Sequence, residues 1–152
     1  MSATAPDGRG EGSLQPGDPA AGLPEAVLVV DDEPALLKVA TRILEGAGFQ
    51  VLRARSGRDA LAIVREGSER LDLVILDVIL PDVRGDEVAS EVLELRPATR
   101  IVVMSGSAEP VHVGMALDAR VVFLLKPFTA AQLLDAVHRA LEVDGADAAS
   151  GG

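Results

Sequence analysis

Five short apolar runs divide this sequence, and segments with helical periodicity separate them. Each run is four to six residues long and rich in Val, Ile and Leu. The runs are residues 27–30 (VLVV), 50–53 (QVLR), 71–76 (LDLVIL), 101–104 (IVVM) and 121–125 (VVFLL). Four of them are apolar on both faces, which is typical of strands buried in a parallel sheet, whereas QVLR is more polar and suits an edge.

Apolar residues recur every three or four positions after each run, which predicts a helix in each interval. The expected boundary signals are, in chain order, Gly46 and Gly48, Ser56, Pro97, and a capping box over Thr129–Gln132. The pattern over residues 110–117 is the weakest because Val111, Val113 and Gly114 are poor helix formers. We therefore predict that this helix is the most mobile regular element.

Strand and helix alternate five times, which predicts an α/β fold with a doubly wound five-stranded parallel sheet flanked by five helices. Right-handed crossovers leave few topologies for such a chain. Ligands of these folds bind outside the carboxyl ends of the strands, near the switch point in strand order. Polar residues that directly follow the apolar runs should therefore meet at one edge of the sheet.

Both ends of the chain differ in composition from the middle. Residues 1–25 are dominated by Gly, Pro, Ala, Ser and acids, and residues 143–152 (VDGADAASGG) are similar. Such segments bury too little apolar surface to offset their ordering entropy. We therefore predict a disordered leader (1–25), one folded domain (26–142) and a disordered tail (143–152).

Composition excludes several functions. The absence of cysteine rules out disulfides and thiolate chemistry, and only two histidines are present, His112 and His138. A net charge of −10 and an aromatic content of 2% disfavour nucleic acid as a direct partner. No apolar stretch approaches a membrane span of about 18 residues, and the start does not resemble a signal peptide. We therefore expect a cytoplasmic protein without a membrane partner.

The polar residues that follow the runs suggest a specific chemistry. They are Asp31, Asp32 and Glu33, then Asp77, then Ser105, Gly106 and Ser107, and finally Lys126. Carboxylates about 4 Å apart repel by roughly 4 kcal/mol, so a bound cation or a raised pKa must hold them together. Oxygen ligands suit Mg²⁺, and Lys126 offsets further charge. A carboxylate beside a divalent ion and an ammonium is a good acceptor for a phosphoryl group.

Four motifs at these positions carry a family resemblance. They are VLVVDDE (27–33), LVILDVILPDVRG (73–85), VVMSGS (102–107) and FLLKPF (123–128). With them in this order, the sequence resembles the receiver domain of bacterial two-component response regulators. The resemblance covers residues 26–142 and implies a flavodoxin-like sheet.

The resemblance also implies a role for each site residue. Asp77 is the expected phosphoryl acceptor. Mg²⁺ is expected to bind Asp31 or Asp32, together with Asp77 and the backbone carbonyl of Ile79; Asp32 is usually the direct ligand in this family. Further expected roles are a hydroxyl donor at Ser105, an ammonium partner at Lys126 with a cis peptide bond to Pro127, a switch aromatic at Phe123, and a loop shaped by Pro81 and Gly85.

The implied function is a phosphorylation switch. A histidine kinase or histidine phosphotransfer protein is the expected phosphoryl donor, and the downstream protein target is unknown. The protein is expected to be a stand-alone receiver or a receiver from a hybrid histidine kinase, and not an enzyme with substrates of its own.

Alternatives remain for the function and for single residues. An aspartyl-phosphate phosphatase usually has a second aspartate two residues after its nucleophile, where this chain has Ile79. A degenerate receiver, acting as a phosphorylation-independent interaction module, would be expected to lack an acid or the lysine. Phe123 could be a simple core ring, and His138 is expected on the surface or in a groove instead of acting in a phosphorelay.

Overall fold

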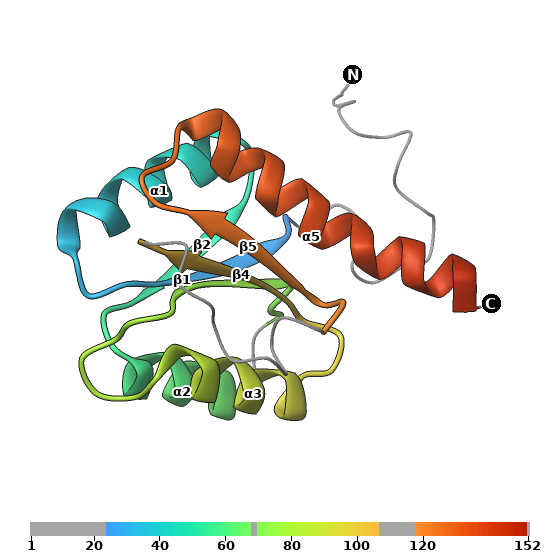
Figure 1. Cartoon of the computed structure of the whole chain (residues 1–152), viewed down its shortest axis with the longest axis horizontal. Coiled ribbons are helices and arrows are strands. Elements are labelled where there is room, and N and C mark those ends of the chain that lie inside the picture. The colour runs from blue at the N-terminus through green and yellow to red at the C-terminus, as the bar shows by residue number, and fades with distance from the viewer. Residues whose placement is uncertain (1–23, 68–69, 107–117, 152) are drawn as a thin grey trace, which may run out of the picture.

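The computed structural model describes residues 24–67, 70–106 and 118–151, with side chains up to Glu142. Five parallel strands form one sheet in the order β2-β1-β3-β4-β5 (Figure 1). The strands are β1 (Ala26–Val30), β2 (Gln50–Ala54), β3 (Leu73–Asp77), β4 (Arg100–Ser105) and β5 (Val121–Leu125). The predicted parallel sheet is confirmed, and the strand order reverses beside β1 and β3.

Four helices cover the sheet within the described residues. They are α1 (Pro34–Gly46), α2 (Gly57–Glu66), α3 (Gly85–Leu95) and α5 (Ala130–Gly151). Figure 1 shows α1 and α5 on one face of the sheet and α2 and α3 on the other. The helix that we predict over 110–117 lies outside the described residues, as do Ser107 and His112.

Side chains of alternate strand residues enter two separate cores, because successive residues of a strand point to opposite faces. Val27, Val29 and Ile75 pack against Leu37 of α1 and Leu133 of α5. The intervening strand residues, such as Leu28, Val30 and Leu76, pack against α2 and α3. Because β1 and β3 are buried on both faces, the polar residues that follow them are held on a rigid support.

The predicted helix starts are confirmed by their hydrogen bonds. The Ser56 hydroxyl accepts the N–H of Asp59 in the first turn of α2. At the start of α5, the Thr129 hydroxyl accepts the N–H of Gln132, and the Gln132 side chain accepts the N–H of Thr129. Both pairs supply acceptors to N–H groups that have no partner within their helix.

The prediction that VVFLL is buried on both faces is wrong. QVLR forms an edge strand as expected, but the opposite edge is β5. Phe123 and Leu125 lie on the same side of the sheet as the buried Val121, yet they are 38% and 58% exposed. Apolar composition alone does not reveal strand order, because crossover connections decide which strand lies outermost.

Helix α5 extends into the C-terminal tail. Its last residue is Gly151, and the disorder that we expect from residue 143 onward stays a prediction. Alanine has the highest helix propensity, and the alanines of residues 143–152 favour continuation of an existing helix. None of the described helices combines the length and apolar character that a membrane crossing requires.

Candidate functional site

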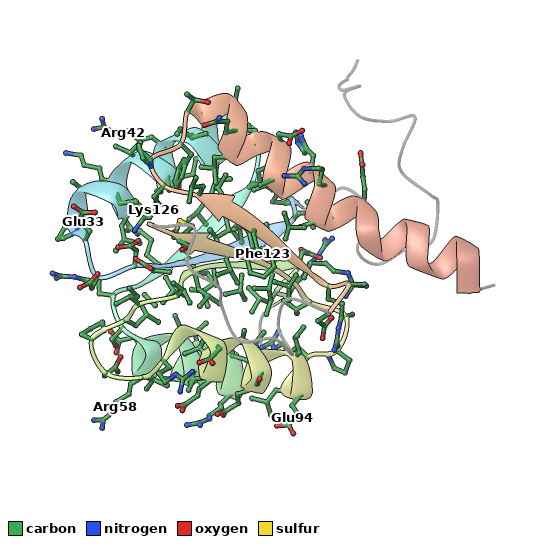
Figure 2. The ribbon with its side chains drawn as sticks, in the orientation of Figure 1. Glu33, Arg42, Arg58, Glu94, Phe123 and Lys126 are labelled. Atoms are coloured by element: carbon green, nitrogen blue, oxygen red, sulfur yellow. The ribbon has the colours of Figure 1, made fainter. Side chains whose placement is uncertain are left out.

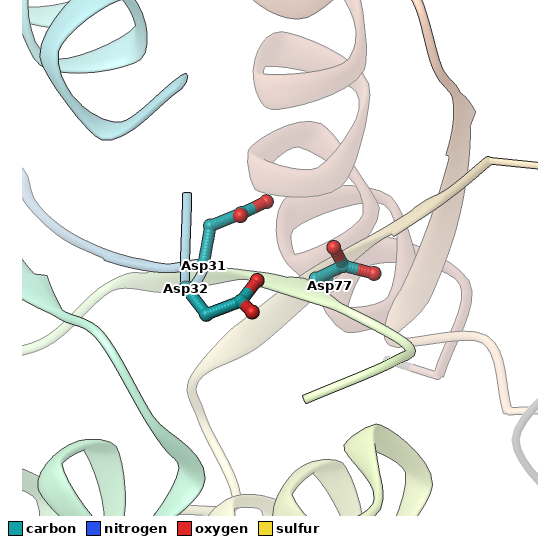
Figure 3. A group of neighbouring side chains, drawn as sticks. All are labelled: Asp31, Asp32 and Asp77. Carbon is teal, nitrogen blue, oxygen red and sulfur yellow. The ribbon is translucent and has the colours of Figure 1, made fainter. Parts of the chain in front are cut away.

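Three carboxyl groups meet at the carboxyl ends of β1 and β3. Asp31 and Asp32 follow β1 directly, and Asp77 is the last residue of β3. Oxygen atoms from these three side chains lie within 4.8 Å of one another, and Figure 3 shows the carboxyl groups gathered in one space. Asp31 is fully buried and Asp77 is 8% exposed, whereas Asp32 is exposed. The predicted meeting of these acids at one edge is confirmed.

Lys126 reaches the same edge from the residue after β5. Its Nζ donates hydrogen bonds to Asp31 Oδ2 at 3.0 Å and to Asp77 Oδ2 at 2.8 Å. Figure 2 shows Lys126 at the end of the molecule where Glu33 begins the turn into α1. The peptide bond between Lys126 and Pro127 is cis, as predicted. A single ammonium thus joins two carboxylates that would otherwise repel each other.

Ser105 lies at this edge as well, at the end of β4. Its neighbour Met104 is the register partner of Asp77, so Ser105 extends one residue past the end of β3. The Ser105 carbonyl accepts the N–H of Lys126 at 2.7 Å, which ties the ends of β4 and β5 together. The hydroxyl, the ammonium and the three carboxylates therefore come from four strand ends on one side of the sheet.

The pKa of Asp31 is raised above its ordinary value. Burial is the largest influence, and hydrogen bonds from the Glu33 N–H and from Lys126 only partly oppose it. For Lys126, burial acts to lower the pKa, but hydrogen bonds and charges from Asp77 and Asp31 together raise it. The Lys126 ammonium therefore stays charged at neutral pH. Burial makes the charged form of Asp31 unfavourable at that pH.

We expect Asp31→Asn to stabilise the fold at neutral pH in the absence of divalent ions. A carboxyl whose folded pKa is raised contributes stability at low pH and loses that contribution as the pH rises through the folded pKa. The neutral amide removes this penalty, and each 1 kcal/mol gained would raise Tm by about 2–4 °C. Thermal unfolding in EDTA measures the effect, and a lower Tm in the variant would contradict it.

The loop after β3 is anchored to Asp77. The Ile79 N–H donates to Asp77 Oδ1 at 3.0 Å, and the Gly85 N–H donates to the Val78 carbonyl at 3.0 Å. A Cβ atom on Gly85 would lie 2.6 Å from both the Asp77 carbonyl oxygen and Val78 Cα. Gly85 is not among the glycines with positive φ in the described residues, so close backbone approach explains this glycine.

Two predicted residues lie away from the carboxylates. Phe123 lies in the middle of β5, three residues before Lys126 (Figure 2). His138 is exposed on α5, as expected, with its ring centre 6.3 Å from that of Phe49. Sequence reasoning also missed a contact of Asp82 in the loop after β3, because its partners, Gly57 and Arg58, are about 25 residues earlier in the chain.

A sequence model of the response regulator receiver domain matches residues 27–138. The chain belongs to the response regulator receiver domain family. It is therefore a signalling domain of two-component systems, a class that works in phosphorelay signalling. The resemblance to this family and the flavodoxin-like fold are both confirmed.

In individual relatives, the matching region is one part of a larger protein. It is 35% identical over 117 residues to the sensor kinase CckA of Brucella abortus, covering 76% of this chain and 12% of that protein. It is 35% identical over 118 residues to the DNA-binding response regulator MtrA of Mycolicibacterium smegmatis, covering 77% of this chain and 50% of that protein. The chain thus spans half or less of these curated relatives.

Solved receiver domains have the same fold. One from Methanospirillum hungatei superposes with a TM-score of 0.73 at 27% identity, covering 82% of this chain and 98% of that one. The receiver domain of the hybrid histidine kinase CckA superposes with a TM-score of 0.65 at 30% identity, covering 76% and 98%.

Proposed function

We propose that Asp77 accepts a phosphoryl group from a phosphohistidine of a histidine kinase or histidine phosphotransfer protein, in a reaction that requires Mg²⁺. The observation that carries the proposal is the double hydrogen bond of Lys126 to Asp31 and Asp77, at the edge where Ser105 also lies. All the polar residues that a degenerate receiver would lack are present at this edge. This favours phosphorylation over a phosphorylation-independent interaction module.

The chain's own residues account for the transfer. A carboxylate oxygen of Asp77 attacks phosphorus, a P–O bond forms, and the P–N bond to the donor imidazole breaks with its electron pair returning to nitrogen. Lys126 offsets negative charge on the phosphoryl oxygens, and the Ser105 hydroxyl donates a hydrogen bond to one of them. The product is an aspartyl phosphate beside a lysine.

The acidic cluster suits Mg²⁺ by its donor set. Hard cations with few protein ligands prefer carboxylate and carbonyl oxygens, and three carboxylates lie within 4.8 Å of one another here. We assign Asp32 and Asp77 as direct ligands with the Ile79 carbonyl, and Asp31 as a ligand directly or through water. When bound, Mg²⁺ supplies positive charge that offsets the carboxylates and the phosphoryl oxygens.

Signal output follows from movement at β4 and β5. Ser105 moves toward the new phosphoryl group, and Phe123 turns inward from the edge strand. Its ring is 38% exposed, so it is not locked into the core. A coupling of about 1–3 kcal/mol between the two positions is enough to change partner affinity.

A groove lies beside the site and supports docking of a protein donor there. The groove has a volume of about 570 Å³, borders Lys126 and runs between α1 and the turn into α5. Apolar residues dominate its lining, among them Leu36, Val39 and Phe128. The similarity to the hybrid histidine kinase CckA receiver supports a kinase or phosphotransfer protein as the donor.

Acetyl phosphate tests the proposal without the cognate kinase. We expect intact-protein mass spectrometry to show the addition of one phosphoryl group after incubation with acetyl phosphate and Mg²⁺. Replacing Mg²⁺ with EDTA should remove most of the adduct, because the carboxylates would then repel the incoming phosphoryl oxygens. Failure to form any adduct, or equal adduct in EDTA, would contradict the proposal.

A further inference from the structure

The loop between β3 and α3 is fastened to α2 by one carboxylate. Asp82 Oδ1 accepts the N–H of Gly57 at 2.9 Å, and Asp82 Oδ2 accepts the N–H of Arg58 at 3.0 Å. Oδ1 also accepts the N–H of Val83 at 2.9 Å, within the loop itself. A side chain of the loop thus caps a helix that is distant in sequence.

Each of the first three N–H groups of α2 has a side-chain acceptor. Ser56, the residue before the helix, accepts only the N–H of Asp59 with its hydroxyl. The two N–H groups that precede Asp59 go to Asp82, because a helix leaves its first N–H groups without internal partners. Hydrogen bonds from backbone N–H groups hold the pKa of Asp82 below its ordinary value, and the bond from Arg58 has the largest effect. The carboxylate is therefore charged at neutral pH.

Close packing reinforces the hydrogen bonds. A Cβ atom on Gly57 would lie 2.8 Å from Val83 Cβ and 3.1 Å from a methyl carbon of Val88. Real Cβ atoms essentially never lie within 3.0 Å of another such atom, so the loop occupies the space that a side chain at Gly57 would need. The loop therefore rests directly on the start of α2.

The same loop begins at the phosphorylation site. Ile79, whose carbonyl we assign to Mg²⁺, lies three residues before Asp82 and donates its N–H to Asp77. Gly85 closes the loop by its hydrogen bond to Val78. Between these two ends, the bonds of Asp82 to α2 limit where the loop backbone can lie, together with the packing of Leu80 and Val83.

We propose that Asp82 is a positioning residue that tethers the loop 78–84 to α2 and so fixes the Ile79 backbone for Mg²⁺ binding beside Asp77. This inference rests on the proposed function, because it presumes a Mg²⁺ site at the acidic cluster. The same tether couples α2 to the site, because a displacement of the start of α2 changes the Mg²⁺ affinity through Asp82.

Calorimetric titration of the whole chain with Mg²⁺ tests the inference. We expect Asp82→Ala to weaken Mg²⁺ binding about tenfold, the lower end of the loss seen when an outer partner of a metal ligand is removed. Asp82→Asn keeps one acceptor oxygen, for Gly57 and Val83, and should restore part of the affinity. Tm is measured for each variant, and titrations are run where all are folded.

Ser56→Ala is the matched control. It removes the other cap of α2 and should cost about 1 kcal/mol of stability without touching the loop. Mg²⁺ affinity should then remain that of the wild type. Gly57→Ala is a second probe. The added methyl has no room beside Val83 and displaces the loop from the start of α2 without changing the Asp82 side chain itself. It should also weaken Mg²⁺ binding.

The outcomes separate the two proposals. If wild-type protein binds Mg²⁺ and Asp82→Ala binds it equally well, the positioning role is overturned and the proposed function stands. An equal loss of affinity in Ser56→Ala overturns it too, because the effect would then come from α2 stability. If the wild type itself binds no Mg²⁺, both proposals fail. Should Asp82→Ala not fold, unchanged affinity in Gly57→Ala overturns the inference.

Discussion

Asp77→Asn should carry no phosphoryl group after incubation with acetyl phosphate and Mg²⁺, whereas the wild-type chain carries one. An amide oxygen is a poor nucleophile, and the substitution removes the only carboxylate at the end of β3. The side chain keeps its size, and its amide oxygen could still accept a hydrogen bond from Lys126. The loss of the adduct would therefore report on chemistry and not on folding, which thermal unfolding checks in parallel.

Asp86→Asn is the control for this result. Asp86 is 9% exposed in the first turn of α3, so it is another buried aspartate, but it is outside the acidic cluster. The variant should form the adduct as the wild type does. Persistence of the adduct in Asp77→Asn would transfer the acceptor role to another side chain and remove the assignment.

Lys126→Met should lower the stability of the folded chain by about 2 kcal/mol at neutral pH in the absence of Mg²⁺. Removing one partner of a buried ion pair costs about 3–5 kcal/mol, and we take a smaller value because the Lys126 side chain is 19% exposed. The Asp31 and Asp77 carboxyl groups then lie side by side without the ammonium between them. For a chain of this size, Tm should fall by about 4–8 °C.

The loss should depend on pH in a defined direction. Without Lys126, the influences that oppose burial at Asp31 weaken, so its folded-state pKa rises further above its ordinary value. A raised pKa contributes stability at low pH and loses it as the pH increases through the folded pKa. The difference from wild type should therefore be small under acidic conditions and should grow toward neutrality.

Lys38→Met serves as the matched control for charge. Lys38 is the other lysine of the chain, and its side chain is exposed on α1. Its replacement removes the same formal charge and should change the stability by less than about 0.5 kcal/mol. Chemical denaturation at several pH values measures both variants, and a similar loss in both would show that net charge, and not the site, is responsible.

The apolar composition of a strand did not predict its position in the sheet. QVLR and VVFLL both form edge strands, although only the first is polar enough to suggest it. The exposed Leu125 and Phe123 belong to a strand that reads as fully buried. Apolar side chains at an edge are compatible with a surface that contacts a partner, so hydrophobicity could not distinguish a central strand from an edge strand here.

Local pattern was sufficient for the elements and for the main site residues. Val, Ile and Leu runs predict strands, capping residues such as Ser56 and Thr129 predict helix starts, and residues placed directly after parallel strands must meet at one edge. Asp31, Asp77 and Lys126 could therefore be grouped from the sequence. The order of the four motifs supplied the family.

Only the tertiary structure decided which residues distant in the sequence contact one another. The tether of Asp82 to the first turn of α2, the lack of space for a side chain at Gly85, and the placement of β5 at an edge depend on how distant backbone segments approach one another. The sequence determined which residues stand at the strand ends because strand and helix formation is governed by neighbours along the chain. Packing alone determined how closely the loop, α2 and β3 approach one another, because those distances are set by the whole fold.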